Sequence, residues 1–221
     1  MQAQKGITGV HGVPAYRPEP IPEALIHEMF DSVRWSPSWR NLRGWHICLL
    51  TGAALQRFKD ELTQRLLDDV PGSPELKTPD RAWPELCLVR TARLMAAHEE
   101  AEARASLEGS REDKLTRLGQ LFGAPCAMIY SVDCKMTGPP GCFNSGAFVQ
   151  SMCEAAHDRG LITCVLATVV KYPELLHGTL PDETGRLFVA GVALGYSDED
   201  VSSTTSVGEA VQFDELVSWV E

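Results

Sequence analysis

The chain has 221 residues, of which 44% are hydrophobic, 23% charged and 7% aromatic, and this composition excludes a disordered or collagen-like chain. The formal net charge of −10 at pH 7 argues against nucleic acid or an anionic membrane surface as a partner, because both would be repelled. A chain of this length buries about 70% of its unfolded surface, so we expect it to fold without disulfide bonds.

Targeting and metal-binding signals are missing from the sequence. Residues 1–12 lack a basic segment followed by an apolar run, and no window holds the roughly 18 consecutive apolar residues of a membrane span. We therefore expect a soluble, cytoplasmic protein with no membrane partner. The seven cysteines form no Cys-x-x-Cys pair, so we expect no metal site and mostly buried free thiols, with Cys134 and Cys142 as the pair at the surface.

The first half of the chain shows helical and strand-like hydrophobic patterns in turn. Apolar residues at helical spacing predict a helix over 22–35. A short apolar run closed by glycine predicts a strand over 45–52, and helical spacing returns over 53–70. Residues 85–109 are rich in Ala, Glu, Leu and Arg, whose propensities favour a further helix.

The second half continues the alternation. It predicts a strand over 127–132, a helix over 144–159 that stops at glycine, a strand over 161–165, a helix over 172–180 and a strand over 187–194. There is no internal repeat or low-complexity tract. We therefore predict one α+β domain over 1–221, with 1–13 as a loose N-terminal arm and a helical middle long enough to reach a partner subunit.

The loop over residues 36–45 holds the densest group of polar and aromatic side chains, Ser-Pro-Ser-Trp-Arg-Asn-Leu-Arg-Gly-Trp. Asparagine offers a donor and an acceptor to the edge of a heterocyclic ring, arginine offers planar donors, and tryptophan stacks. The loop is thus a candidate site for a flat polar ligand. In the alternative interpretation, both tryptophans anchor the core and Arg40 and Arg43 pair with acidic residues.

Four stretches in the same order as in the nitroreductase family give the sequence a family resemblance. The loop matches the family's Pro-Ser-x-x-Asn-x-x-x-Trp pattern at Pro37, Ser38, Asn41 and Trp45. The other stretches are Phe-Gly-Ala-Pro at 122–125, Asn-Ser-Gly-Ala-Phe-Val-Gln at 144–150 and Ala-Leu-Gly-Tyr at 193–196. Residues 160–166, followed by Tyr-Pro-Glu at 172–174, resemble the single-domain branch that reduces nitroaromatic acids.

The resemblance implies a central mixed, mainly antiparallel sheet flanked by helices, in an obligate homodimer with FMN at the subunit interface. It implies electron transfer from NAD(P)H to a small nitroaromatic or conjugated acceptor. FMN supplies the redox chemistry, so no protein acid or base is needed and we assign no catalytic residue. The resemblance places the cofactor against two segments, whose candidate residues are Ser36, Pro37, Ser38, Arg40, Asn41 and Arg43 in the loop, and Thr163, Cys164, Val165 and Leu166 farther along the chain.

The sequence departs from the family at the cofactor phosphate. The family's N-terminal Arg-x-Ser-x-Arg is replaced by residues 11–16, His-Gly-Val-Pro-Ala-Tyr, and its second basic cluster by 201–210, which hold no cation. Arg17, Arg40 and Arg43 are the substitutes that the sequence offers. The alternative hypothesis is a divergent member that has lost FMN and uses the dimer cleft for another planar ligand or a partner protein.

Overall fold

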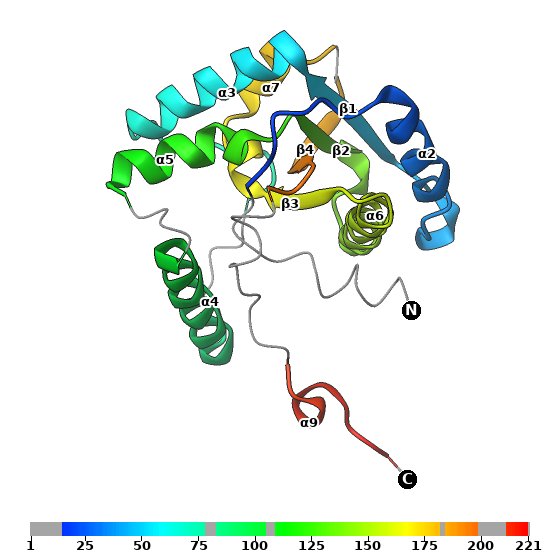
Figure 1. The fold of residues 1–221 in the computed structure, drawn as a ribbon. Helices are drawn as coiled ribbons and strands as arrows, with labels where there is room; N and C mark the ends of the chain where they lie inside the picture. The colour runs from blue at the N-terminus through cyan, green and yellow to red at the C-terminus, as the bar shows by residue number, and fades with distance from the viewer. Residues whose placement is uncertain (1–14, 78–82, 105–108, 182–183, 199–210, 221) are drawn as a thin grey trace.

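A four-stranded sheet lies at the centre of the part of the chain that the computed structural model describes, residues 15–77, 83–104, 109–181, 184–198 and 211–220 (Figure 1). The strands are β1 (Trp45–Thr51), β2 (Cys126–Asp133), β3 (Ile162–Leu166) and β4 (Arg186–Gly195), in the spatial order β1-β2-β4-β3. All three pairings are antiparallel. The α+β prediction is confirmed, and the sheet that we expected to be mixed is antiparallel throughout these described strands.

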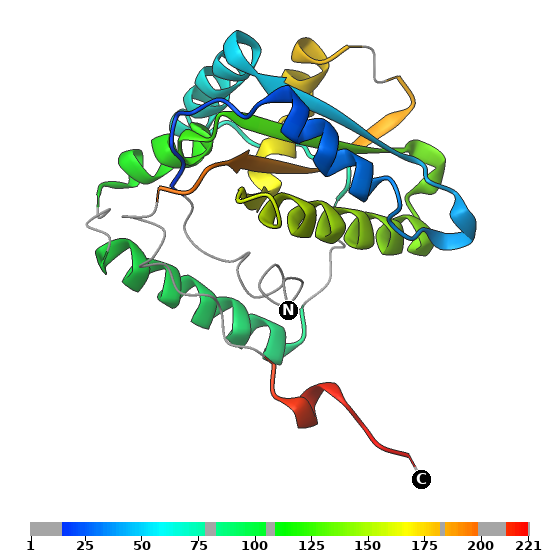
Figure 2. The same cartoon turned by 45° about the vertical axis from the view of Figure 1, so that its right-hand side comes forward.

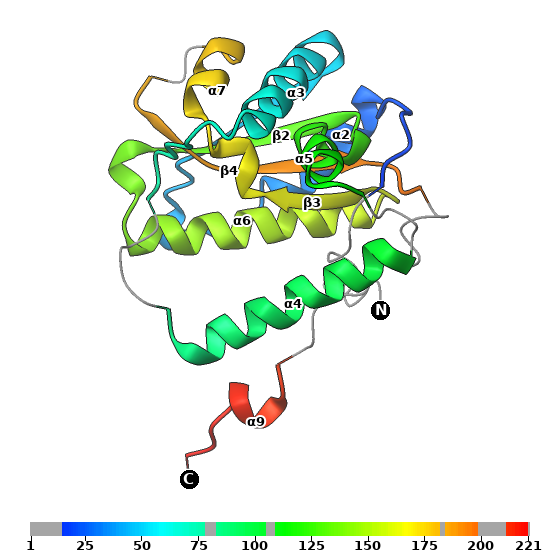
Figure 3. The same cartoon turned by 90° about the vertical axis from the view of Figure 1, so that its left-hand side faces the viewer.

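Helices cover both faces of the sheet (Figure 3). One face carries α3 (Gly52–Leu67), α5 (Arg111–Gly119) and α7 (Pro173–Thr179). The other carries α2 (Glu23–Val33) and α6 (Pro139–His157), which pack against each other (Figure 2). The result is a three-layer arrangement with two apolar cores, one on each side of the sheet.

Strand β2 shows why two cores form. Its side chains alternate between the faces, with Met128 and Tyr130 in the α2/α6 core and Ala127 and Ile129 in the α3/α7 core. All four are at most 1% exposed. A continuous apolar run in the sequence therefore marks a central strand that is buried on both faces.

Two helices of the described chain, one long and one short, lie outside these layers. They are α4 (Glu85–Arg104) and α9 (Phe213–Leu216), which extend below the body of the molecule (Figures 1 and 3). An ion pair between Arg90 and Glu215, 2.6 Å from Nη2 to Oε2, joins the two helices. Several of their apolar side chains, including Leu88 on α4 and Phe213 on α9, are more than half exposed.

The remaining expectations differ from the structure in detail. Helix α6 begins at Pro139 rather than at residue 144, because prolines occupy its first turn, where no backbone N–H is needed. Helix α5 went unrecognised, although Ser110 and Asp113 form a capping box at its start. The expectation of mostly buried thiols is wrong, because three of the seven free cysteines, Cys87, Cys134 and Cys142, are exposed.

The described residues show neither a membrane-spanning helix nor a metal-binding cluster. None of their helices is long and apolar enough to cross a membrane, and they contain no cluster of three or more metal-binding side chains. The expected N-terminal arm, 1–13, lies outside the described residues. The chain is tied down just after it, where the Tyr16 hydroxyl donates a 3.1 Å hydrogen bond to the carbonyl oxygen of Ala193.

Candidate functional site

The loop after α2 has an unusual backbone. Arg40, Asn41 and Arg43 have φ angles of 49°, 58° and 44°, in the left-handed region that residues with a side chain seldom adopt. Each such residue costs about 1–3 kcal/mol and persists only where its surroundings hold it in place. Strain of this kind gathers at ligand-binding sites, and here it coincides with the loop that the sequence singled out.

Three of the hydrogen bonds of the loop involve its first residues. The Trp39 N–H donates to Oδ1 of Asn144 on α6 over 2.6 Å. The Asn41 N–H donates to the Ser38 carbonyl oxygen over 3.0 Å, and the Arg43 N–H donates to Ser38 Oγ over 3.3 Å. The first of these bonds ties the start of the loop to α6, while the other two close the loop on itself. At the end of the loop, the Asp133 N–H and the Arg186 guanidinium donate to the carbonyl oxygen of Gly44.

The side chains of the loop are available to a ligand. Asn41, Arg40 and Arg43 are exposed, and neither guanidinium has an ion-pair partner within the described residues. Ser36 is 5% exposed, and its Oγ has no hydrogen-bond partner in the described structure. Within this part of the chain, the alternative in which Arg40 and Arg43 serve surface ion pairs therefore finds no support.

The second predicted segment, residues 163–166, lies on β3 at the other side of the sheet. Thr163 faces α6, where its side chain hydrogen-bonds to the thiol of Cys153. Cys164 faces the opposite core, and burial raises the pKa of its thiol to about 12. Burial therefore disfavours the thiolate of Cys164, the form in which a cysteine acts as a nucleophile. Val165, which is 46% exposed, is the member of the segment most open to a ligand.

The two segments do not meet within one chain. The loop leads into β1, which is one edge of the sheet, and residues 163–166 form β3, which is the other edge. Three strand spacings of about 4.8 Å put roughly 14 Å between these edges, and α6 covers the face between them. Sequence reasoning identified both segments but did not show that one chain holds them apart.

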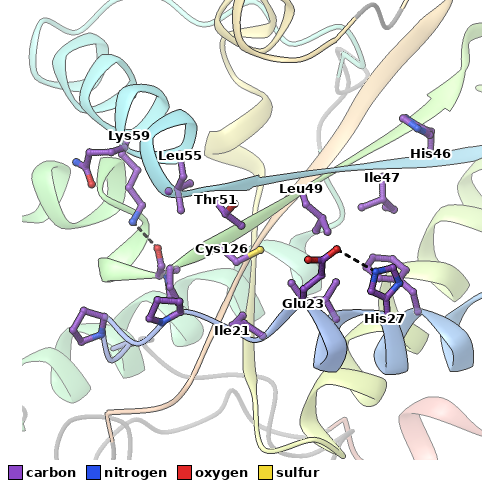
Figure 4. A pocket seen from close by; sticks show the side chains of 18 of the residues that line it. Ile21, Glu23, His27, His46, Ile47, Leu49, Thr51, Leu55, Lys59 and Cys126 are labelled. Carbon is purple, nitrogen blue, oxygen red and sulfur yellow. Dashed lines mark hydrogen bonds and ion pairs between the residues drawn. The ribbon is translucent and has the colours of Figure 1, made fainter.

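A large pocket of the described structure lies elsewhere, between α2, β1 and α3 (Figure 4). Its volume is about 1180 Å³, and its walls include Ile21, Ile47 and Leu55. None of the ten candidate cofactor residues lines it. The pocket runs along the outer edge of β1, which pairs with no other described strand, so it is an open groove beside an edge strand rather than a cavity around the predicted site.

Lys59 is the buried charged group of this groove. It is 5% exposed, and its Nζ donates a 2.6 Å hydrogen bond to the carbonyl oxygen of Ala124 (Figure 4). Burial lowers the pKa of Lys59, because the ammonium group loses hydration that one carbonyl only partly replaces. The bond joins α3 to the Gly-Ala-Pro junction before β2, so we interpret Lys59 as a structural link.

The arginines proposed for the cofactor phosphate lie in two places. Arg17 lies beside the end of β4, with its guanidinium 5.3 Å from the ring centre of Tyr196 and 3.7 Å from Glu19. Arg40 and Arg43 lie in the loop at the β1 side. Two stretches, 11–16 and 201–210, replace the family's basic clusters. Of these residues, the structure describes only 15 and 16.

Sequence reasoning missed one residue of the site. Asn144 was noted for its place in a family-like stretch but not as a support of the loop. Its signal in the sequence was a polar side chain at a position of α6 that faces the protein interior, where its exposure is 2%.

Comparison with known proteins agrees with this fold. Residues 13–196 match the family model described as the Nitroreductase family, so most of the chain is covered and it belongs to that family. It is 28% identical over 204 residues to 4-nitrobenzoate reductase from Pseudomonas putida, covering 86% of this chain and 83% of that protein. It is 25% identical over 212 residues to chloronitrobenzene nitroreductase from Comamonas testosteroni, covering 91% and 89%.

Solved structures confirm the fold. The FMN-dependent nitroreductase NfnB from Mycobacterium smegmatis, in complex with NADPH, superposes with a TM-score of 0.87 at 19% identity, over 100% of this chain and 98% of the other. The FMN- and NADPH-dependent NfnB from a Sphingopyxis strain gives 0.84 at 24% identity, over the full length of both chains. The resemblance drawn from four sequence stretches is thereby confirmed at the level of family and fold.

Proposed function

We propose that this protein is an FMN-dependent oxidoreductase that passes electrons from NAD(P)H to a small nitroaromatic or conjugated acceptor. The observation that carries the proposal is the strained loop over 36–43, which exposes an amide and two guanidinium groups that have no ion-pair partner among the described residues, next to a buried hydroxyl. Relatives named for the reduction of 4-nitrobenzoate and chloronitrobenzene support the same chemistry.

The chemistry of the loop fits a flavin. A flavin ring presents both donors and acceptors along its edge, and the Asn41 carboxamide can pair with either kind. Arg40 and Arg43 supply cationic donors that favour the negative charge of a reduced ring or of a phosphate. The unpartnered Ser36 Oγ is a further donor and acceptor at the start of the loop.

FMN, when bound, supplies the acceptor and the donor of the hydride, and the protein's part is to bind, orient and shield it. The loop residues fix the polar edge of the ring. Val165 presents an exposed apolar side chain on the edge strand β3, beside the buried Thr163. No described group in either segment is needed as an acid or base.

We infer that the functional unit is a homodimer in which the loop of one chain and β3 of the other share one cofactor. The separation of the two segments at opposite edges of the sheet supports this arrangement. So does α4, a 20-residue helix whose apolar side chains, such as Leu86, Leu88 and Met95, are more than half exposed. A helix without a packed face is marginal in water, so a second subunit is needed to cover it.

Absorbance spectroscopy of the purified protein tests the cofactor. The proposal expects the visible bands of oxidised flavin, either as purified or after reconstitution with FMN, together with bleaching by NADPH or NADH without oxygen. Addition of 4-nitrobenzoate should restore the bands as the nitro group is reduced. A colourless protein that FMN cannot reconstitute would instead support the flavin-free alternative.

A further inference from the structure

Asn144 connects α6 to the candidate cofactor loop. It lies in the second turn of α6, is 2% exposed, and accepts the Trp39 N–H at Oδ1 over 2.6 Å, although 105 residues separate the two positions. Trp39 opens the turn Trp39–Asn41, so this bond fixes the point at which the strained backbone of the loop begins.

The other end of the same carboxamide has no partner. Nδ2 of Asn144 is buried and makes no hydrogen bond within the described structure. A buried amide with unpaired donors costs about 1–3 kcal/mol of stability, so an asparagine is a poor choice if packing were its only role. Ser36 Oγ, at the start of the same loop, is also buried without a partner.

These observations combine into one assignment. We propose that Asn144 is a positioning residue, which uses its 2.6 Å contact with the Trp39 N–H to hold residues 39–43 in the conformation that binds the cofactor. The inference rests on the proposed function of this loop. The hydrogen bond to Asn144 matters because the backbone at Arg40 and Asn41 is strained. Without this bond, the loop relaxes to unstrained conformations that present its side chains differently.

The inference predicts a specific separation of stability from binding. Asn144→Leu keeps the branched shape and the number of side-chain heavy atoms, removes the unpaired amide and deletes the acceptor for Trp39. Its melting temperature should stay close to the wild-type value, while the dissociation constant for FMN rises about tenfold or more, because a smaller fraction of molecules holds the competent loop. Titration of apoprotein with FMN, followed by quenching of flavin fluorescence, measures that constant without turnover.

Two further variants provide the controls. Asn144→Asp keeps an oxygen that accepts the Trp39 N–H, so it should recover most of the FMN affinity that Asn144→Leu loses. Ser145→Ala removes a neighbouring hydroxyl that donates to the Gly141 carbonyl and accepts from Tyr130, and it makes no contact with the loop in the described structure. It should lower the melting temperature and leave the FMN affinity unchanged.

The outcomes distinguish this inference from the proposed function. If wild-type protein binds no FMN, the proposed function fails. If wild type binds FMN and Asn144→Leu binds it equally well, the proposed function stands and the positioning role is wrong. Should Asn144→Leu fail to fold, Asn144→Ala replaces it, and an unchanged FMN affinity in that variant would likewise overturn the inference.

Discussion

A cofactor site shared between two chains can be tested by combining two defective variants. The first variant, Asn41→Ala with Arg43→Ala, removes exposed polar groups of the loop. The second, Val165→Arg, places a bulky cation on the 46% exposed position of β3. All three positions are exposed, but Asn41 and Arg43 have left-handed backbone conformations, so the free energy of unfolding of each variant is measured beside its flavin content to separate lost stability from a damaged site.

The expected magnitude follows from the positions of the segments. Each homodimer of a single variant has two damaged sites and should lose flavin. If each site takes its loop from one chain and its β3 from the other, a heterodimer of the two variants has two different sites. One site combines the altered loop with the altered β3, and the other combines the two unaltered segments. The heterodimer should therefore hold about one flavin per dimer, half of the wild-type content.

Coexpression with two different affinity tags and purification over both columns isolates the heterodimer, and flavin absorbance against protein concentration gives the stoichiometry. A dimer of loop variant and wild type, prepared in the same way, is the matched control and should also hold about one flavin. A heterodimer without flavin would mean that one chain supplies both segments. A stable, flavin-loaded monomer in sedimentation would refute the shared site altogether.

Three other predictions concern the phosphate, the packing of α6 and the groove. If Arg40 or Arg43 contacts the cofactor phosphate, its change to alanine should raise the FMN dissociation constant by roughly 10- to 100-fold and leave riboflavin binding unchanged. Arg17 already pairs with Glu19, so Arg17→Ala should change the FMN dissociation constant by less than about fivefold. Gly141→Ala should destabilise the protein by several kcal/mol in urea unfolding, since a Cβ there would lie 1.6 Å from the Met136 carbonyl oxygen. Gly146→Ala on the same helix places its Cβ in open space and should stabilise the protein by about 0.5–1 kcal/mol. Burial lowers the Lys59 pKa from its ordinary 10.5, so the unfolded chain binds more protons between the two pKa values and stability should rise with pH across that window. Lys59→Met should flatten this rise in urea unfolding curves, and an unchanged pH dependence would contradict the assignment.

Local patterns predicted the elements and pointed to the cofactor loop. The helical spacing before residue 35, the apolar runs of β1, β2 and β4, and the glycine that ends α6 each depend on neighbours in the chain, so the sequence displays them directly. The polar and aromatic residues at 36–45 stood out for the same reason. The predicted elements differ from the structure at α5, which begins with a capping box, and at the start of α6, which begins with two prolines. Both signals involve only a few residues.

Tertiary structure decided which of these segments come together. The strand order β1-β2-β4-β3 puts the loop and residues 163–166 at opposite edges, and hydrophobic periodicity contains no information about strand order. Asn144 reaches Trp39, and Lys59 reaches Ala124, only because distant elements pack side by side. Sequence therefore determined the elements and the chemistry of the loop, while the packing of elements far apart in the chain determined how the loop is supported and how far it lies from residues 163–166.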